Sequence, residues 1–261
     1  MTDQLLIEQR GRVLIKTFNN PEMRNALSPE IYKAAFEALD KAENDPDIGA
    51  VVYTGMGQHF CAGGNLNRLK EDRNREKSEQ RARVDLLNAW VEKMRTFPKP
   101  IIAAVEGAAA GAGFSLALGC DLVVAAEDAV FAMSYVKVAL NPDGGGSMFL
   151  CRGLPHQLAA ELMLEGGVIE PQRLHALGIV NRLVEPGKSL EAAVVWADKI
   201  AAGPTAAHGR IKSLLEQSYQ GSVIDHLNVE ADYINDAVFH PEAWEGISAF
   251  FDKRKPKFPR G

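Results

Sequence analysis

The chain has 261 residues, of which 46% are hydrophobic and 24% are charged. This composition is typical of a folded globular protein and excludes a mostly disordered chain. The formal net charge of -5 argues against nucleic acid as a partner, because that ligand needs a broad basic surface. We therefore expect one main core with an appendage and no nucleic-acid partner.

The sequence also lacks the signals of a disulfide framework, a targeting peptide and a membrane span. The three cysteines are too few and too widely spaced for a disulfide framework or a Cys-x-x-Cys metal site. The segment Met1–Gly11 has neither the apolar run of a signal peptide nor the basic character of a transit peptide. No apolar stretch approaches the roughly eighteen residues of a membrane span. These features favour a cytoplasmic protein with no membrane partner.

The N-terminal part predicts strands, a helix and another strand in succession. Two short apolar runs within Leu5–Phe18, broken at Gly11, indicate a β-hairpin. Ser28 and Pro29 are typical of an N-cap followed by the first position of a helix. The β-branched run Ile48–Thr54 then predicts a buried strand. This order is typical of an α/β protein with a parallel sheet.

The rest of the chain continues the pattern and then becomes helical. Arg68–Arg83 is dominated by charge and predicts an exposed, mobile helix or loop. Helical periodicity resumes over Val84–Phe97 and ends at the prolines after Phe97. Later segments are expected to be mainly helical as far as Phe251, with three further strands, at Ile101–Val105, Asp121–Ala126 and Ile179–Val184.

Three segments consist largely of small residues, namely Cys61–Leu66, Gly107–Gly113 and Asn141–Gly146. Such residues let a ligand approach backbone N–H groups, and the first two segments lie at predicted strand-to-helix junctions. Helix N-termini present unpaired N–H donors, so two junctions that converge on one oxygen would form an oxyanion hole. Taken singly, each segment is better explained by close packing of a helix on a sheet.

Other ligand-binding and catalytic motifs each lack at least one required residue. Gly111-Ala112-Gly113 lacks the third glycine of a dinucleotide fingerprint, and the chain has no P-loop. Ser115 has Ala117 where a nucleophile elbow needs glycine, so a serine hydrolase is disfavoured. His59 and Cys61 lie two residues apart, but without further ligands or an orienting acid they favour ordinary packing over a metal or thiol-imidazole site.

The small-residue segments resemble, in order and spacing, the motifs of the crotonase (enoyl-CoA hydratase/isomerase) superfamily. The matching strings are Phe60–Leu66, Lys99–Gly113, Cys120-Asp121 and Pro142–Gly146, and the resemblance covers nearly the whole chain. It implies a crotonase-like (ClpP/crotonase) spiral of ββα units over residues 1–200. It also implies a helical C-terminal trimerisation region over residues 201–261, and hence a homotrimer or a dimer of trimers.

The resemblance also implies a chemistry and its residues. Members of the superfamily act on acyl-CoA thioesters and hold the thioester oxygen with two backbone N–H groups, which match Gly64 and Ala112 here. No metal or separate cofactor is implied, because coenzyme A is part of the substrate. Matching positions also suggest substrate-binding residues: Arg24, Ala26, Ala62, Asn65, Leu66, Tyr135 and Lys253. Asn65 stands where the superfamily usually has aspartate.

The acidic residues depart from the pattern of hydratases. The two glutamates of family hydratases match Ser115 and Tyr135 here, so both carboxylates are absent. Adding water needs one group to activate the water and another to handle the α-proton, which disfavours hydration. Asp143 supplies a single carboxylate, which suffices for isomerisation. As Pro-Asp-Gly it could equally be a turn residue, and dehalogenases of the superfamily place a nucleophilic aspartate in this loop.

The closest resemblance is to isomerases of the 1,2-epoxyphenylacetyl-CoA and Δ3,Δ2-enoyl-CoA type. The expected function is therefore an acyl-CoA isomerase that shifts a double bond or rearranges a ring epoxide through a thioester enolate. Two alternatives stay open at this point. One is an enoyl-CoA hydratase with an atypical active site, and the other is a non-catalytic acyl-CoA-binding homologue. The acyl group itself is not indicated by the sequence.

Overall fold

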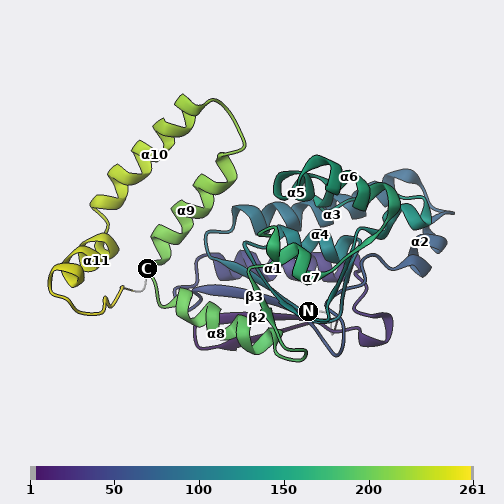
Figure 1. Ribbon diagram of the computed structural model, residues 1–261, viewed down its shortest axis with the longest axis horizontal. Coiled ribbons are helices and arrows are strands. Elements are labelled where there is room, and N and C mark those ends of the chain that lie inside the picture. Colours follow the sequence, from purple (N-terminus) through teal and green to yellow (C-terminus); the bar gives the residue numbers. More distant parts are fainter. Residues whose placement is uncertain (1–3, 260–261) are drawn as a thin grey trace.

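The computed structural model describes residues 4–259, and it has a layered α/β core (Figure 1). The larger sheet contains β1 (Leu5–Arg10), β2 (Val13–Phe18), β3 (Ala50–Gly55), β4 (Ile101–Val105), β6 (Leu122–Ala126) and β9 (Arg182–Val184), paired in that order. The β1–β2 pair is antiparallel and the other pairs are parallel. A smaller sheet has the order β5 (Ala108–Ala110), β7 (Val130–Ala132), β8 (Val168–Ile169).

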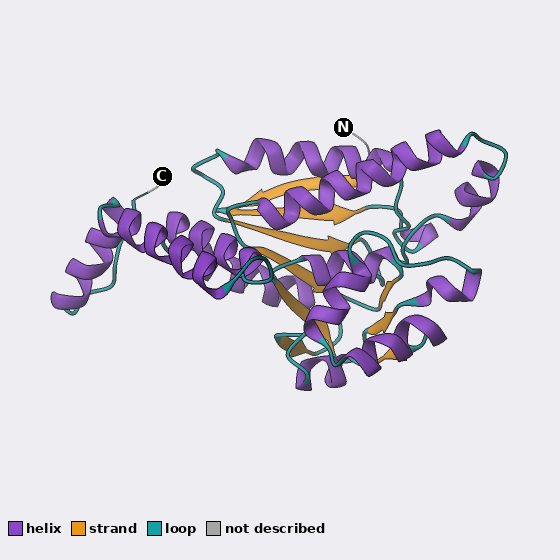
Figure 2. Cartoon of the chain, turned by 90° about the horizontal axis from the view of Figure 1, so that it is seen from above, coloured by secondary structure: helices purple, strands orange, loops and turns teal. Residues whose placement is uncertain are grey.

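Helices cover both faces of the larger sheet (Figure 2). One face packs against α8 (Ser189–Ala201), and the other packs against α1 (Pro29–Glu43), α3 (Lys77–Thr96) and α4 (Ala112–Gly119). Side chains of β2 alternate between the two, with Val13 and Ile15 on the α8 side and Leu14 and Phe18 on the other. Because both faces are buried, the strands are continuously apolar.

Further core helices come after the first and third small-residue segments in the chain. They are α2 (Leu66–Asp72), α5 (Gly146–Gly153), α6 (His156–Glu165) and α7 (Pro171–Ala176). Two 3-10 turns precede these segments: η1 (Pro21–Met23) comes before the first, and η2 (Ser134–Val138) comes before the third. The predicted hairpin, the parallel sheet and the helix that begins at Pro29 are confirmed. The Oγ of Ser28 accepts a hydrogen bond from the N–H of Ile31 at 3.4 Å, as the N-cap prediction requires.

Two expectations about secondary structure were wrong in detail. The charged segment is exposed and largely helical, which is one of its two expected forms, but the helix predicted from Val84, α3, begins seven residues earlier, at Lys77. Its exposed face is stabilised by pairs four residues apart, such as Arg81 with Asp85 at 2.7 Å. The strands β5, β7 and β8 were also missed. They contain three residues or fewer, which is too short to show a strand period.

The last three helices, α9 (Thr205–Gln217), α10 (Val223–Val238) and α11 (Pro241–Phe251), extend to one side of the core (Figure 1). Two buried charged side chains, Glu242 of α11 and Lys212 of α9, attach these helices to each other and to the core. The carboxylate of Glu242 accepts the N–H groups of Ala206 and Ala207 at the start of α9. The Nζ of Lys212 donates to Asp121 at 2.6 Å. No helix among residues 4–259 is long and apolar enough to cross a bilayer.

One lysine lies wholly inside the core. Lys16 of β2 is 0% exposed and sits on the same face as Leu14 and Phe18. Its Nζ donates to the carbonyl oxygen of Ala35 at 3.1 Å and to the hydroxyl of Tyr53 at 3.2 Å. The indole N–H of Trp90 donates to the same hydroxyl at 3.0 Å. A buried polar network links the sheet to α1 and α3 through these contacts.

Candidate active site

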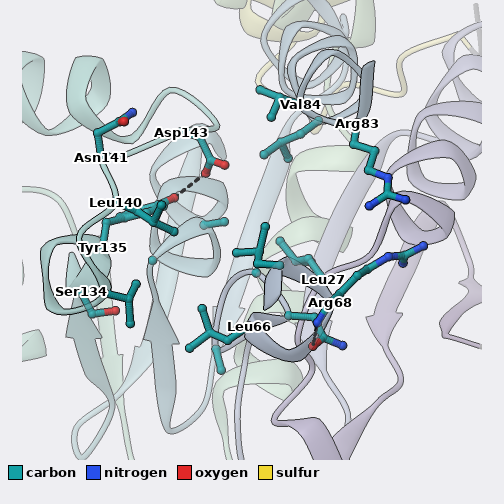
Figure 3. A pocket seen from close by; sticks show the side chains of 18 of the residues that line it. Leu27, Leu66, Arg68, Arg83, Val84, Ser134, Tyr135, Leu140, Asn141 and Asp143 are labelled. Carbon is teal, nitrogen blue, oxygen red and sulfur yellow. Dashed lines mark hydrogen bonds between the residues drawn. The ribbon is translucent and has the colours of Figure 1, made fainter. Parts of the chain in front are cut away.

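A pocket of about 460 Å³ opens where the small-residue segments meet α1, α3 and η2 (Figure 3). Its walls are mostly apolar and carry a few polar groups, which matches an organic ligand with a reactive end. Figure 3 shows one wall formed by Tyr135, Leu140 and Asp143, with Leu27 and Val84 facing them across the cavity. The pocket therefore draws on segments from residues 27 to 143 of the chain.

The first two small-residue segments pack backbone against backbone. Cys61 pairs with Ala109 in an isolated parallel bridge. A Cβ placed on Gly113 would lie 2.1 Å from the carbonyl oxygen of Cys61, and one on Gly63 would lie 2.6 Å from the carbonyl oxygen of Ala110. Only glycine allows this approach, since real Cβ atoms do not come so close. The spacing of small residues thus reflects both loop packing and access for a ligand.

Two backbone N–H groups remain available at the pocket. Gly64 follows Gly63, whose φ is +94°, and Ala112 follows Gly111, whose φ is +52°. Ala112 is the first residue of α4, so its N–H has no partner inside the helix. Within the described part of the chain, neither Gly64 nor Ala112 donates a hydrogen bond, and both line the pocket. This arrangement can hold an anionic oxygen.

Asn25 positions the first of these segments, and the sequence reasoning did not single it out. Its side chain is 0% exposed and its Nδ2 donates to the carbonyl oxygens of Met56 and His59 at 3.0 and 2.6 Å. Its φ is +57°, a conformation that asparagine tolerates better than most residues. The N–H of Leu27, two residues later, donates to Gly63 at 2.8 Å. The feature of the sequence that could have identified Asn25 is the presence of an asparagine within a tight turn.

Asp143 is the only carboxylate among the described residues that line the pocket. It lies in the turn before α5, where Gly144 and Gly145 have φ values of +57° and +80°. The hydroxyl of Tyr135 donates to its Oδ1 at 2.6 Å (Figure 3). Burial raises the pKa of Asp143 above its usual value, and the bond from Tyr135 opposes that rise. The result is a carboxylate with enhanced basicity.

Ser115 lies behind Tyr135 and does not line the pocket. Its Oγ is 3.3 Å from the hydroxyl of Tyr135, so Ser115, Tyr135 and Asp143 form one chain of contacts. A Cβ on Gly146 would lie 2.2 Å from that Oγ, which shows how tightly the position is packed. The contact between Tyr135 and Asp143 was not predicted, because Tyr135 was expected only as a pocket or core residue.

The other predicted substrate-binding residues fall into two groups. Ala62, Asn65 and Leu66 line the pocket, and the Oδ1 of Asn65 also caps α2 by accepting the N–H of Arg68 at 3.2 Å. The second group comprises Arg24, Ala26 and Lys253, none of which lines it. The first two belong to the turn that holds the first loop, and Lys253 follows α11, at the opposite end of the molecule from α2 (Figure 1).

His59 and Cys61 have structural roles. The Nδ1 of His59 accepts the N–H of Ala108 at 3.2 Å, which ties the two loops together. Burial raises the pKa of the Cys61 thiol to about 12, so the thiol is neutral and unreactive. Its sulfur accepts the N–H of Gly63 at 3.4 Å. Packing, rather than metal or thiol chemistry, accounts for both side chains.

Residues 8–260 match the family described as Enoyl-CoA hydratase/isomerase. The chain belongs to this family. It is 36% identical over 258 residues to enoyl-CoA hydratase EchA19 of Mycobacterium tuberculosis, with 97% of this chain and 95% of the relative covered. It is 34% identical over 259 residues to 1,2-epoxyphenylacetyl-CoA isomerase of Escherichia coli, with 99% of each covered.

Solved structures of the enoyl-CoA hydratase/isomerase family confirm the crotonase-like fold. The crystal structure of an enoyl-CoA hydratase from Polaromonas sp. JS666 superposes with a TM-score of 0.96 and is 48% identical, covering 98% of this chain and 99% of that one. The C-terminal helical region belongs to the shared fold. The protein is therefore an enzyme of this family, which acts on CoA thioesters, while the relatives include both hydratases and an isomerase.

Proposed function

We propose that the protein is an acyl-CoA isomerase that moves the double bond of a 3-enoyl-CoA to the 2-position or rearranges a ring epoxide. The observation that carries this proposal is the single carboxylate at the pocket. Asp143 is the only acid among the described residues that line it, and the positions of the two hydratase glutamates hold Ser115 and Tyr135. One carboxylate can serve an isomerisation but lacks the second group that water addition requires.

The proposed reaction is a proton transfer within one substrate. Asp143 removes a proton from C2, and the electrons of the C–H bond move into a dienolate whose charge rests on the thioester oxygen. The N–H groups of Gly64 and Ala112 stabilise that oxygen, each by about 3 kcal/mol. Asp143 then returns the proton to C4, which leaves the double bond between C2 and C3. Atoms and charge balance without a further reactant.

The hydrogen bond from Tyr135 leads to a prediction about pH. Replacing Tyr135 with Phe removes a donor that stabilises the Asp143 carboxylate, so the pKa of Asp143 should rise further above its usual value. The base form would then predominate only at higher pH. We expect the acid limb of the kcat/KM profile to move up by about one pH unit. The profile of Tyr135→Phe, measured beside that of the wild type, checks this.

A matched control is available in Tyr233, whose hydroxyl lies 2.9 Å from the Oγ of Ser213 in the C-terminal helices. Tyr233→Phe removes the same atom at a distance from the pocket and should leave the acid limb in place. An acid limb that is unchanged in Tyr135→Phe would contradict the role given to this hydrogen bond.

The proposed activity is tested by offering the purified enzyme a 3-enoyl-CoA and a 2-enoyl-CoA separately. Mass spectrometry reports water addition, and NMR reports the position of the double bond. Conversion of the first without hydration of the second supports the isomerase. Fast hydration would instead support an atypical hydratase, the activity named for several relatives. Tight binding without exchange of α-protons in deuterated water would indicate a non-catalytic acyl-CoA-binding protein.

We also propose that the enzyme assembles as a homotrimer or a dimer of trimers through its C-terminal helices. Supporting this, α10 has no buried residue in the isolated chain. Large apolar side chains stand exposed on α9 to α11, among them Leu215, Ile224, Leu227, Ile234, Trp244 and Phe250. Such a surface marks a contact with another protein surface. Light scattering coupled to size-exclusion chromatography measures the number of chains.

A further inference from the structure

Tyr32 of α1 lines the pocket and is its second phenol, in addition to Tyr135. Its side chain lines the cavity and is partly buried against the core. The ring lies against Trp90 of α3, with ring centroids 6.1 Å apart and an interplanar angle of 31°. Packing on a fully buried indole fixes the ring, so the hydroxyl has a defined place in the wall of the pocket.

The hydroxyl of Tyr32 has no hydrogen-bond partner among residues 4–259. The other phenols that are not exposed are satisfied: Tyr53 by Trp90 and Lys16, Tyr135 by Asp143, and Tyr233 by Ser213. A tyrosine hydroxyl in a largely apolar setting normally finds a partner. Tyr32 is thus a donor that faces the space where a ligand binds.

The phenol shares the pocket with the candidate catalytic groups. Burial raises the pKa of Tyr32, and the negative charge of Asp143 raises it further. The hydroxyl therefore keeps its proton and acts as a hydrogen-bond donor. It makes no hydrogen bond to Asp143, whose Oδ1 accepts the hydroxyl of Tyr135. The proton of Tyr32 is therefore available to an acceptor atom that enters the pocket.

A second unpaired polar atom belongs to a residue that lines the pocket. The Oε1 of Gln80, on α3, is buried without a hydrogen-bond partner within the described part of the chain, and Gln80 also lines the pocket. A buried polar atom that lacks a hydrogen-bond partner destabilises its site. A wholly hydrocarbon acyl chain would leave the Tyr32 hydroxyl unsatisfied, whereas the Gln80 oxygen is itself an acceptor and would need a donor.

We propose that the Tyr32 hydroxyl donates a hydrogen bond to an oxygen atom carried by the acyl group, beyond the thioester. The preferred substrates are therefore acyl-CoA thioesters whose chain or ring bears an oxygen acceptor rather than plain hydrocarbon chains. This inference rests on the proposed function, because it names the substrate class of the same site. The bond holds the acyl group and need not take part in proton transfer.

The test compares a plain 3-enoyl-CoA with analogues in which an ether oxygen replaces one methylene, at C6, C7 or C8 in turn. An added hydrogen bond to a positioned donor raises kcat/KM by about tenfold. For the wild type we expect such a preference at one of these positions. In Tyr32→Phe, the ratio of kcat/KM for that analogue to kcat/KM for the plain chain should fall by about tenfold. Tyr219→Phe, at an exposed tyrosine of the C-terminal region, should keep the wild-type ratio.

Three results would overturn the inference about Tyr32. A ratio that is unchanged in Tyr32→Phe would overturn the inference, as would equal losses on both substrates, which would indicate action on Asp143 or on the thioester. Absence of any preferred oxygen position in the wild type would overturn it too. The dissociation constants of saturated ether and plain acyl-CoAs, measured by calorimetry, give the same comparison without turnover. Failure of the proposed isomerisation is therefore distinguishable from failure of this inference.

Discussion

Asp143→Asn should lower kcat/KM for isomerisation of a 3-enoyl-CoA by about 1,000-fold. The amide has nearly the size of the carboxylate but cannot remove a proton from C2, and a general base of this kind contributes about 100- to 10,000-fold. The neighbours of Asp143 remain in place, so binding should change much less than turnover. Initial rates, together with the dissociation constant of a saturated acyl-CoA, separate the two effects.

Asp128→Asn is the matched control, because Asp128 is exposed in the turn between β6 and β7, away from the pocket. It makes the same chemical change and should keep wild-type rates. Isomerisation that persists in Asp143→Asn would remove this residue from the role of base. Loss of turnover with α-proton exchange retained in deuterated water would instead favour Asp143 as a nucleophile toward carbon.

Gly113→Ala should lower kcat/KM by about 100- to 1,000-fold, although the substitution adds a single methyl group. The new Cβ would lie 2.1 Å from the carbonyl oxygen of Cys61, so the two loops would have to separate. Separation moves the N–H of Ala112 relative to that of Gly64, and loss of one oxyanion donor has this effect on rate. Rates measured at a temperature where circular dichroism shows the variant folded report the effect on catalysis.

Gly119→Ala tests the same helix without the same contact. The nearest atom to a Cβ at Gly119 is 3.4 Å away, on the ring of Phe149, so ordinary packing can accept it. This variant should retain most of the activity. An undiminished kcat/KM in Gly113→Ala would show that the close approach of the two loops is not needed for catalysis.

Much of the fold follows from local signals in the chain. Ser28 and Pro29 define the start of α1, and continuous apolar runs define β3, β4 and β6, because each signal acts through its own residues. The short strands β7 and β8 have no such signal. Val130–Ala132 becomes a strand only because β5 and β8 lie on either side of it, and that neighbourhood is set by tertiary structure.

The candidate site likewise combines residues that the sequence indicates with contacts that only the structure reveals. Gly64, Ala112 and Asp143 could be named in advance only because their loops resemble the motifs of the crotonase superfamily, and the structure brings all three to one pocket. The bond between Tyr135 and Asp143 depends on how η2 and the turn after it fold back, which no spacing reveals. Tyr32 looked like one more residue of a helix, and only its unpaired hydroxyl distinguishes it.

The lysine buried in the centre of the core links stability to proton concentration. Burial lowers the pKa of Lys16 well below its usual value, whereas in the unfolded chain the amine titrates near pH 10.4. Between these two values the unfolded chain binds a proton that the folded chain does not. The free energy of unfolding therefore rises with pH through this range, by as much as about 1.4 kcal/mol per pH unit from this one group. The contribution of Lys16 is complete above the pKa of the unfolded amine and is lost as the pH falls through the lowered pKa of the folded state.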